Sequence, residues 1–408
     1  MDANQIYLDL QLRYQHRLRR LASRILGRSI ELVSLSDKEL LQRMRRKLPV
    51  LRRGKFDFAS RRYLALMDEL RTLRSRQLEK AWEEAQKQIK EFASATQDKE
   101  EERTLAALPV RVPFARIPPT VLLAVLREPF AGGPLDARTF PQWLDSIKVA
   151  DFGRIEAAIQ SGIVQGISTS DVARSLAGTK KQKYADGILG NTRRNFQAVL
   201  GAGITHVHNG VSEKLWEKNP DISRYMQWGS VLDGRTSAVC RARDGKFAPI
   251  GDNVLPKGLP RLIPPETRPP AHPNCRSIVV PVFDASGLAG IVSERPFVRE
   301  TTKDEFKKIN FRQRAKDSLG SGVWKGMSEQ ERQRAVDAVR DKWLSDRIGT
   351  VPADLTYDGW LRGQPVEFQN EVLGRSKAAL FRRGLKIDRF VDRSGRELTV
   401  PELRKLLE

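Results

Sequence analysis

The sequence has only two cysteines, Cys240 and Cys275, in 408 residues. Two cysteines are too few to cross-link a small secreted scaffold with disulfide bonds, so that class of protein is excluded. Long apolar runs are also missing: the longest, Val121–Leu126, falls far short of the roughly 20 residues that a membrane-spanning helix needs. The residues after Met1 do not form a basic-then-apolar signal peptide. We therefore expect a soluble, intracellular protein without a membrane partner.

The composition is that of a folded protein. Hydrophobic residues make up 40% of the chain, and its 29 glycines bring the apolar total close to that of ordinary globular proteins. At about 150 residues per domain, a chain of this length predicts two or three units and ample material for a core.

Positive charge is in large excess. The chain has 72 Lys and Arg against 50 Asp and Glu, a formal net charge of +22, which attracts polyanions such as nucleic acid or an acidic protein. The first 55 residues carry 14 basic and five acidic residues, and arginine, which binds phosphate and carboxylate through two hydrogen bonds, predominates there. The predicted polyanion-binding residues are Arg13, Arg17, Arg20, Arg24, Arg45, Arg46, Arg52 and Arg53. The alternative is a solvated helix face that only keeps the protein soluble.

The pattern of the first 119 residues predicts an arm and a linker. Residues 1–97 are predicted to form a basic helical hairpin, because apolar residues recur at helical spacing up to about Gly27 and again from about Ser60 to Phe92. Ser36 and Glu39 fit a capping box, which predicts that a helix begins there. Residues 98–119 are predicted to be a proline-rich linker, because proline cannot continue a helix.

The remaining chain divides into a core domain, residues 120–298, and a C-terminal helical region, residues 299–408. In the core domain, helical patterns cover residues 140–173 and 191–218, and Ser168 is placed to cap a short helix. Ser328 and Thr399 begin capping-box patterns in the C-terminal region.

Two segments of the core domain have the character of β-strands. Arg224–Leu232 alternates like a half-buried strand, and Ser277–Phe283 resembles a second strand in which Pro281 implies an edge position. The predicted fold class is therefore α+β and mostly α-helical: a helical N-terminal arm, a small β-containing central domain and a helical C-terminal region.

The most distinctive residues gather between these two strands. They are Trp228, Asp233, Arg235, Thr236, Cys240, His272, Cys275 and Arg276, with Asp244-Gly245 between Cys240 and His272. In this order the pattern resembles the phage Mu F-like family of minor head, or head-morphogenesis, proteins. The resemblance extends from about Pro119 to Glu408 and covers the arm only loosely. It implies a minor capsid protein in the virion, inside the head near the portal vertex, and in the host cytoplasm during assembly.

The resemblance also implies partners: the portal protein and other capsid or scaffold proteins. The basic N-terminal hairpin independently fits contact with packaged double-stranded DNA or with an acidic surface of the portal. The function that the resemblance implies is head assembly together with DNA packaging or ejection.

Chemically, Cys240, His272 and Cys275 offer two thiolates and an imidazole, a mixture that zinc favours. A structural zinc site needs four ligands, and the fourth would have to come from Asp233, His206 or His208. The incomplete set favours a purely structural motif, in which Asp233 and Thr236 cap a turn, His272 hydrogen-bonds locally and the thiols are buried. Zinc is thus the one cofactor that the sequence suggests, and no other is expected.

Two further functions compete with the virion protein: a metal-dependent hydrolase or nuclease, and a non-specific DNA-binding protein. The sequence lacks an HExxH motif, a nucleophile elbow and a phosphate-binding glycine loop, so we assign no catalytic residues. It also lacks zinc-finger spacing and the aromatic motif of RNA-recognition domains, which argues against sequence-specific reading of nucleic acid.

Overall fold

The computed structural model describes residues 3–51, 57–108, 112–130, 137–182, 184, 186–262, 268–283, 295–298, 309–345, 348–351 and 355–407, with some side chains left out, those of residues 12–26 among them. The chain divides into two units. The helical unit consists of Arg13–Ile222 and Pro265–Ile278. The mixed unit consists of Met1–Leu12, Ser223–Pro264 and Val279–Glu408.

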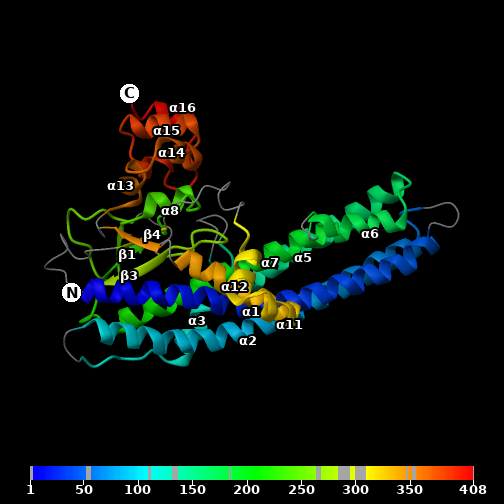
Figure 1. Ribbon diagram of the computed structural model, residues 1–408, viewed down its shortest axis with the longest axis horizontal. Coiled ribbons are helices and arrows are strands. Elements are labelled where there is room, and N and C mark those ends of the chain that lie inside the picture. The colour runs from blue at the N-terminus through cyan, green and yellow to red at the C-terminus, as the bar shows by residue number, and fades with distance from the viewer. Residues whose placement is uncertain are drawn as a thin grey trace. The chain divides into compact units, whose positions relative to one another are not determined.

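The helical unit is built on four long helices. Its elements are α1 (Ala3–Leu51, from residue 13 onward), α2 (Arg61–Ala107), α3 (Pro119–Val125), α5 (Phe140–Val164), α6 (Thr169–Ala177), the 3-10 helix η1 (Lys180–Gln182) and α7 (Ile188–Lys218). α2, α5 and α7 contact one another in pairs, and Figure 1 shows them running alongside α1. Their amphipathic patterns explain this bundle, because each helix turns an apolar stripe toward its neighbours.

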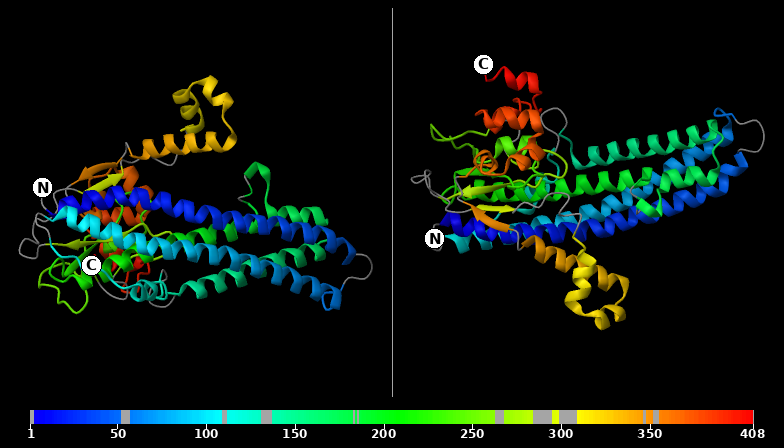
Figure 2. Two further views of the ribbon diagram at one scale, coloured as in Figure 1. Left: turned by 90° about the horizontal axis from the view of Figure 1, so that it is seen from below. Right: turned by 45° about the horizontal axis from the view of Figure 1, so that its top comes forward.

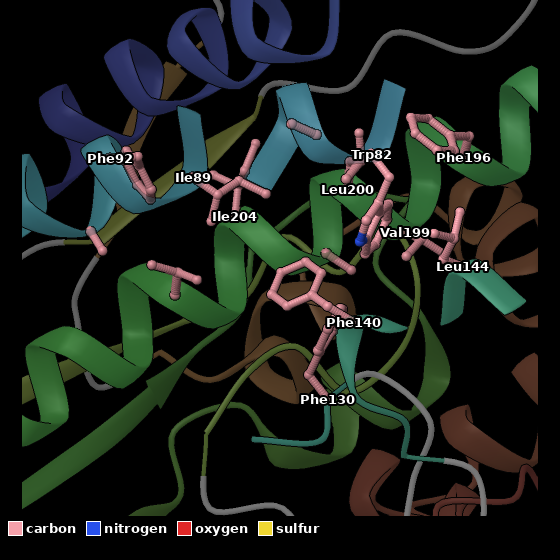
Figure 3. Close-up of a cluster of buried hydrophobic side chains, with 14 of the residues drawn as sticks. Trp82, Ile89, Phe92, Phe130, Phe140, Leu144, Phe196, Val199, Leu200 and Ile204 are labelled. Atoms are coloured by element: carbon pink, nitrogen blue, oxygen red, sulfur yellow. The ribbon is translucent and has the colours of Figure 1, made fainter. Parts of the chain in front are cut away.

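Aromatic rings fill the centre of this bundle (Figure 3). The Trp82 ring of α2 lies edge-on to Phe140 of α5, at 5.5 Å between centroids, and to Phe196 of α7, at 5.8 Å. Gly203 of α7 faces the same Phe140: a Cβ atom at position 203 would lie 2.4 Å from that ring. α7 can therefore approach Phe140 this closely only because residue 203 has no side chain.

A second apolar cluster, the distal core, closes the other end of the bundle. It joins the end of α1, the start of α2, the second half of α5, all of α6 and the start of α7. Its buried members are Leu40, Met44, Leu48, Tyr63, Leu66, Met67, Leu70, Phe152, Ile155, Ile159, Val172, Ala173, Leu176 and Leu189.

Between the two apolar clusters lies a buried group of charges that reaches all four long helices. Arg74 of α2 pairs with Asp37 of α1 at 2.8 Å and with Asp151 of α5 at 2.6 Å. From α7, Arg193 pairs with Asp37, and the Thr192 hydroxyl donates to Asp151. The side chains of Arg74, Asp37 and Asp151 are at most 5% exposed. Burial raises the pKa of Asp37, against the opposing effect of the two arginines.

The predicted helix start at Ser36 is wrong. α1 is one continuous helix from Ala3 to Leu51, so Ser36 lies in its interior. The Ser36 hydroxyl accepts a hydrogen bond from Arg74 and not from the backbone of a first turn. A glycine in a helix costs about 1 kcal/mol relative to alanine, and Gly27 alone does not interrupt α1.

The predicted boundary at residue 97 is also wrong, because α2 continues to Ala107. Residues 98–107 contain no proline or glycine, and ion pairs such as Lys99–Glu102 and Glu100–Arg103 support their helix. The hairpin of α1 and α2 is, moreover, not a separate arm: beyond residue 12 it belongs to the same unit as α5 and α7, because its apolar stripe packs against them.

The mixed unit contains two small sheets and short helices. Its elements are β1 (Tyr225–Gly229), α8 (Ala238–Arg243), β2 (Phe247–Pro249), β3 (Ile278–Val282, from residue 279), β4 (Arg295–Val298), α10 (Phe311–Leu319), α11 (Ser321–Gly326), α12 (Glu329–Ser345), β5 (Ile348–Val351), α13 (Tyr357–Arg362), α14 (Val366–Leu373), α15 (Arg375–Arg382), the 3-10 helix η2 (Ile387–Phe390) and α16 (Val400–Arg404). The first sheet has the order β2-β1-β3, with β1 and β2 antiparallel; β4 and β5 form an antiparallel pair.

The predicted fold class, α+β and mostly α-helical, is confirmed. Ser168 caps α6, and Pro281 lies in β3 at an edge of the sheet, as its missing N–H donor requires. The capping boxes at Ser328 and Thr399 are both present. Over the part of the chain that the structure describes, no helix has the length and apolar character needed to cross a bilayer.

Candidate functional site

The motif segment begins with a tight turn after β1. The Asp233 carboxylate accepts a hydrogen bond from the Arg235 amide at 3.0 Å. The Thr236 hydroxyl lies 2.5 Å from the Val231 carbonyl oxygen and 3.1 Å from the Asp233 carboxylate. Asp233 and Thr236 are both buried. These two side chains therefore hold the turn closed, which is the local role that short polar residues take when they bond to nearby backbone.

Past this turn, a chain of hydrogen bonds joins β1 to helix α8. The indole N–H of Trp228 donates to the Ser230 hydroxyl at 3.0 Å, and that hydroxyl donates to the Cys240 carbonyl at 2.8 Å. Ser237 caps α8 by accepting from the Cys240 amide at 3.3 Å. Trp228 and the Cys240 thiol side chain are buried, and the Arg243 guanidinium lies over the Trp228 ring. The first half of the motif thus packs as a small core.

Asp244 connects this core to the C-terminal helices. Its carboxylate accepts one hydrogen bond from the Ser230 amide at 2.8 Å and another from the Tyr357 amide, at the start of α13, at 2.7 Å. The Tyr357 hydroxyl donates to the Asp233 carbonyl at 2.7 Å, and Arg241 donates to the Val372 carbonyl at the end of α14. The motif therefore holds the C-terminal region in place. The Asp-Gly pair of the motif pointed to Asp244; nothing in the sequence pointed to Tyr357.

The second half of the motif lies in the helical unit. The Cys275 amide donates to the His272 carbonyl at 3.1 Å, and His272 Nδ1 lies 2.8 Å from the Pro273 carbonyl. Cys275 is buried. His272 thus engages the backbone beside it.

Arg268 anchors this segment to its own unit. Its side chain is 17% exposed and pairs with Glu128 and with Glu213 of α7. The Asn209 amide, also on α7, donates to the Pro269 carbonyl at 3.4 Å. The segment that carries His272 and Cys275 is therefore attached to α7 by a buried cation between two carboxylates.

The three predicted zinc ligands are divided between the units. Cys240 belongs to the mixed unit, and His272 and Cys275 belong to the helical unit. A zinc ion shared by all three stays a prediction.

Residues 153–280 match the family model described as phage Mu protein F like protein. The matched range contains the whole motif from Trp228 to Arg276. Over this range the chain is similar to phage Mu protein F. The match covers the second half of α5, all of α6, α7, β1, α8 and β2, and the start of β3, and it supports a part in phage head morphogenesis. A search of curated proteins and a search of solved structures both gave no match.

Two further histidines, His206 and His208, lie inside the matched range. Burial, and to a lesser extent the charge of Arg268 on His206 and of Arg103 on His208, lowers the pKa of both histidines to about 3. His206 Nε2 lies 2.9 Å from the Val125 carbonyl, and its ring stacks on Phe130. Both histidines are therefore neutral parts of the α7 core at physiological pH.

The structure places two of the eight predicted polyanion-binding arginines. Arg45 and Arg46 are exposed on α1, near its end. The side chains of Arg13, Arg17, Arg20 and Arg24 lie outside the described part, as do residues 52 and 53 with Arg52 and Arg53.

Replacing Asp244 by alanine tests whether the motif holds the C-terminal helices. The Asp244→Ala variant leaves the amides of Ser230 and Tyr357 without their acceptor, and each such buried group costs about 1–3 kcal/mol. Hydrogen exchange should become faster at Tyr357 and through α13–α16, with α2 as an internal reference. Glu367→Ala, at an exposed position of α14, should leave hydrogen exchange unchanged both at Tyr357 and through α13–α16. Unaltered exchange at Tyr357 in Asp244→Ala would refute this role.

Proposed function

We propose that the chain is a minor capsid protein of a tailed phage, bound at the portal vertex inside the head and acting in head assembly and in DNA packaging or ejection. The family match over residues 153–280, with the complete motif inside it, is the observation that carries this proposal. Its proposed partners are the portal protein, other capsid or scaffold proteins, and packaged double-stranded DNA. It is synthesised in the host cytoplasm and ends in the virion.

A structural role suits the motif better than catalysis. Metal-dependent nucleases need carboxylates that reach a metal ion and a phosphate. Asp233 and Asp244 are buried, and both accept hydrogen bonds from backbone amides. This arrangement supports a non-enzymatic protein over the alternative hydrolase or nuclease.

Particles of the encoding phage test the proposal directly. The chain should be found by mass spectrometry in purified virions and in emptied heads or their contents, and it should copurify with the portal protein. Particles assembled without the gene should form, package or infect less efficiently. Absence of the chain from purified virions would overturn the proposal, whatever the protein binds in isolation.

Zinc at Cys240, His272 and Cys275 is a second proposal, supported by the chemistry of two thiolates and one imidazole. Elemental analysis of the purified chain should then give one zinc per molecule, and Cys275→Ala should lose the ion and unfold at lower temperature. The Cys275→Ser variant, whose side chain has nearly the volume of cysteine, serves as the matched control for the loss of side-chain volume in Cys275→Ala. Less than one ion per chain, together with unchanged stability of Cys275→Ala, would exclude the site.

A further inference from the structure

One end of the helical unit collects exposed basic side chains from three separate segments. Arg45 and Arg46 lie near the end of α1, Arg61 and Arg62 begin α2, and Lys180 and Lys181 form η1 between α6 and α7. We call these six residues the distal basic surface. In both views of Figure 2, the α6–α7 connection lies part-way along the bundle, in the half that ends at the α1–α2 hairpin.

The register of the hairpin brings the first two pairs together. Arg43 and Lys47 of α1 both pair with Glu69 of α2, so Arg45 and Arg46 lie at the level of that residue. Arg62 is seven residues before Glu69 on α2, which corresponds to about 10 Å along a helix. The two arginine pairs are therefore neighbours on one hairpin.

The distal core holds the lysine pair at this same end. Tyr63, next to Arg62, and Leu176, at the end of α6, are buried in that one cluster. The loop after α6 is closed by Asp186, whose carboxylate accepts from the Thr179 amide and the Thr179 hydroxyl, both at 2.8 Å. Lys180 and Lys181 thus lie in a short loop that these two hydrogen bonds close.

The charges of this surface are available to a partner. The other cations nearby are engaged: Arg43 and Lys47 with Glu69, and Arg174 with Asp171. Among the described residues, no ion pair involves any of the six members of the distal basic surface. The surface keeps a clear positive excess, although exposed acidic residues such as Asp57 and Asp68 also lie nearby.

We propose that the distal basic surface binds the phosphate backbone of double-stranded DNA. Protein–DNA interfaces are much more positively charged than protein–protein interfaces, whereas lysine is depleted where proteins bind each other. Paired arginines and lysines on separate segments can contact several phosphates along one duplex without reading bases. The choice of DNA as partner rests on the proposed function. The distal basic surface extends the predicted polyanion-binding region beyond the first 55 residues to α2 and η1.

A charge-matched pair of variants tests this surface with the purified full-length chain and a duplex of arbitrary sequence. The test variant carries Arg45→Gln, Arg46→Gln, Lys180→Gln and Lys181→Gln. The control carries Lys80→Gln, Lys87→Gln, Lys90→Gln and Lys218→Gln, four exposed lysines outside the distal end. Both lose four positive charges. Affinity is measured by fluorescence anisotropy between 50 and 200 mM salt, and circular dichroism checks that each variant is folded.

The proposal predicts that only the test variant loses most of its affinity, at least tenfold at low salt. Each phosphate contact contributes about 0.9 to the slope of log affinity against log salt, so the slope should become shallower by about 3 to 4 in the test variant. Three results would each overturn the proposal that this surface binds DNA. They are an equal loss of affinity in both variants, wild-type binding that does not weaken with salt, and no wild-type binding. None of these outcomes bears on whether the chain is present in virions, so the proposed function is tested separately.

Discussion

The architecture of the helical unit depends on one buried ionic arrangement. Arg74 lies between Asp37 and Asp151, and Arg193 and Thr192 complete the contacts of those carboxylates. Two cations and two anions balance, so the group is neutral as a whole; Arg74, Asp37 and Asp151 are buried, and Arg193 is partly exposed. Removing charged groups from water is costly, and the pairing of opposite charges offsets that cost. The arrangement is satisfied only when α1, α2, α5 and α7 are all in register.

The need to pair buried charged groups also explains the structure of the motif. Asp233 and Asp244 are buried carboxylates, and backbone amides supply their hydrogen bonds. In the helical unit, a carboxylate pairs with a distant arginine and so fixes how helices align. In the mixed unit, Asp244 bonds the amides of Ser230 and Tyr357 and so fixes where the chain returns after more than 100 residues. The hydrogen bonds of Asp233 and Asp244 thus give the motif a structural role in the folded chain.

Short sequence patterns predicted the local structure correctly where that structure depends on a few neighbouring residues. The cap at Ser168, the edge position of Pro281 and the capping boxes at Ser328 and Thr399 were all predictable from the sequence. The Ser36 pattern failed because its hydroxyl serves Arg74, 38 residues away. Strand β2 was missed because three residues carry too little pattern.

Within the candidate site, sequence analysis found the turn residues Asp233 and Thr236 but not Tyr357. The contact of Tyr357 with the motif exists only through tertiary folding. The convergence of Arg62 and Lys181 at one end of the bundle was equally beyond the sequence, since 119 residues separate them.

A double-mutant cycle on Arg74 and Asp151 tests the central claim most directly. Arg74→Met should lower the free energy of unfolding by about 3–5 kcal/mol, because it leaves buried carboxylates without their cation. Adding Asp151→Asn to that variant should restore part of the loss, because one of those charges is then removed. Urea unfolding of the two single variants and the double variant measures the coupling. A double variant that loses the sum of both single effects would contradict the account.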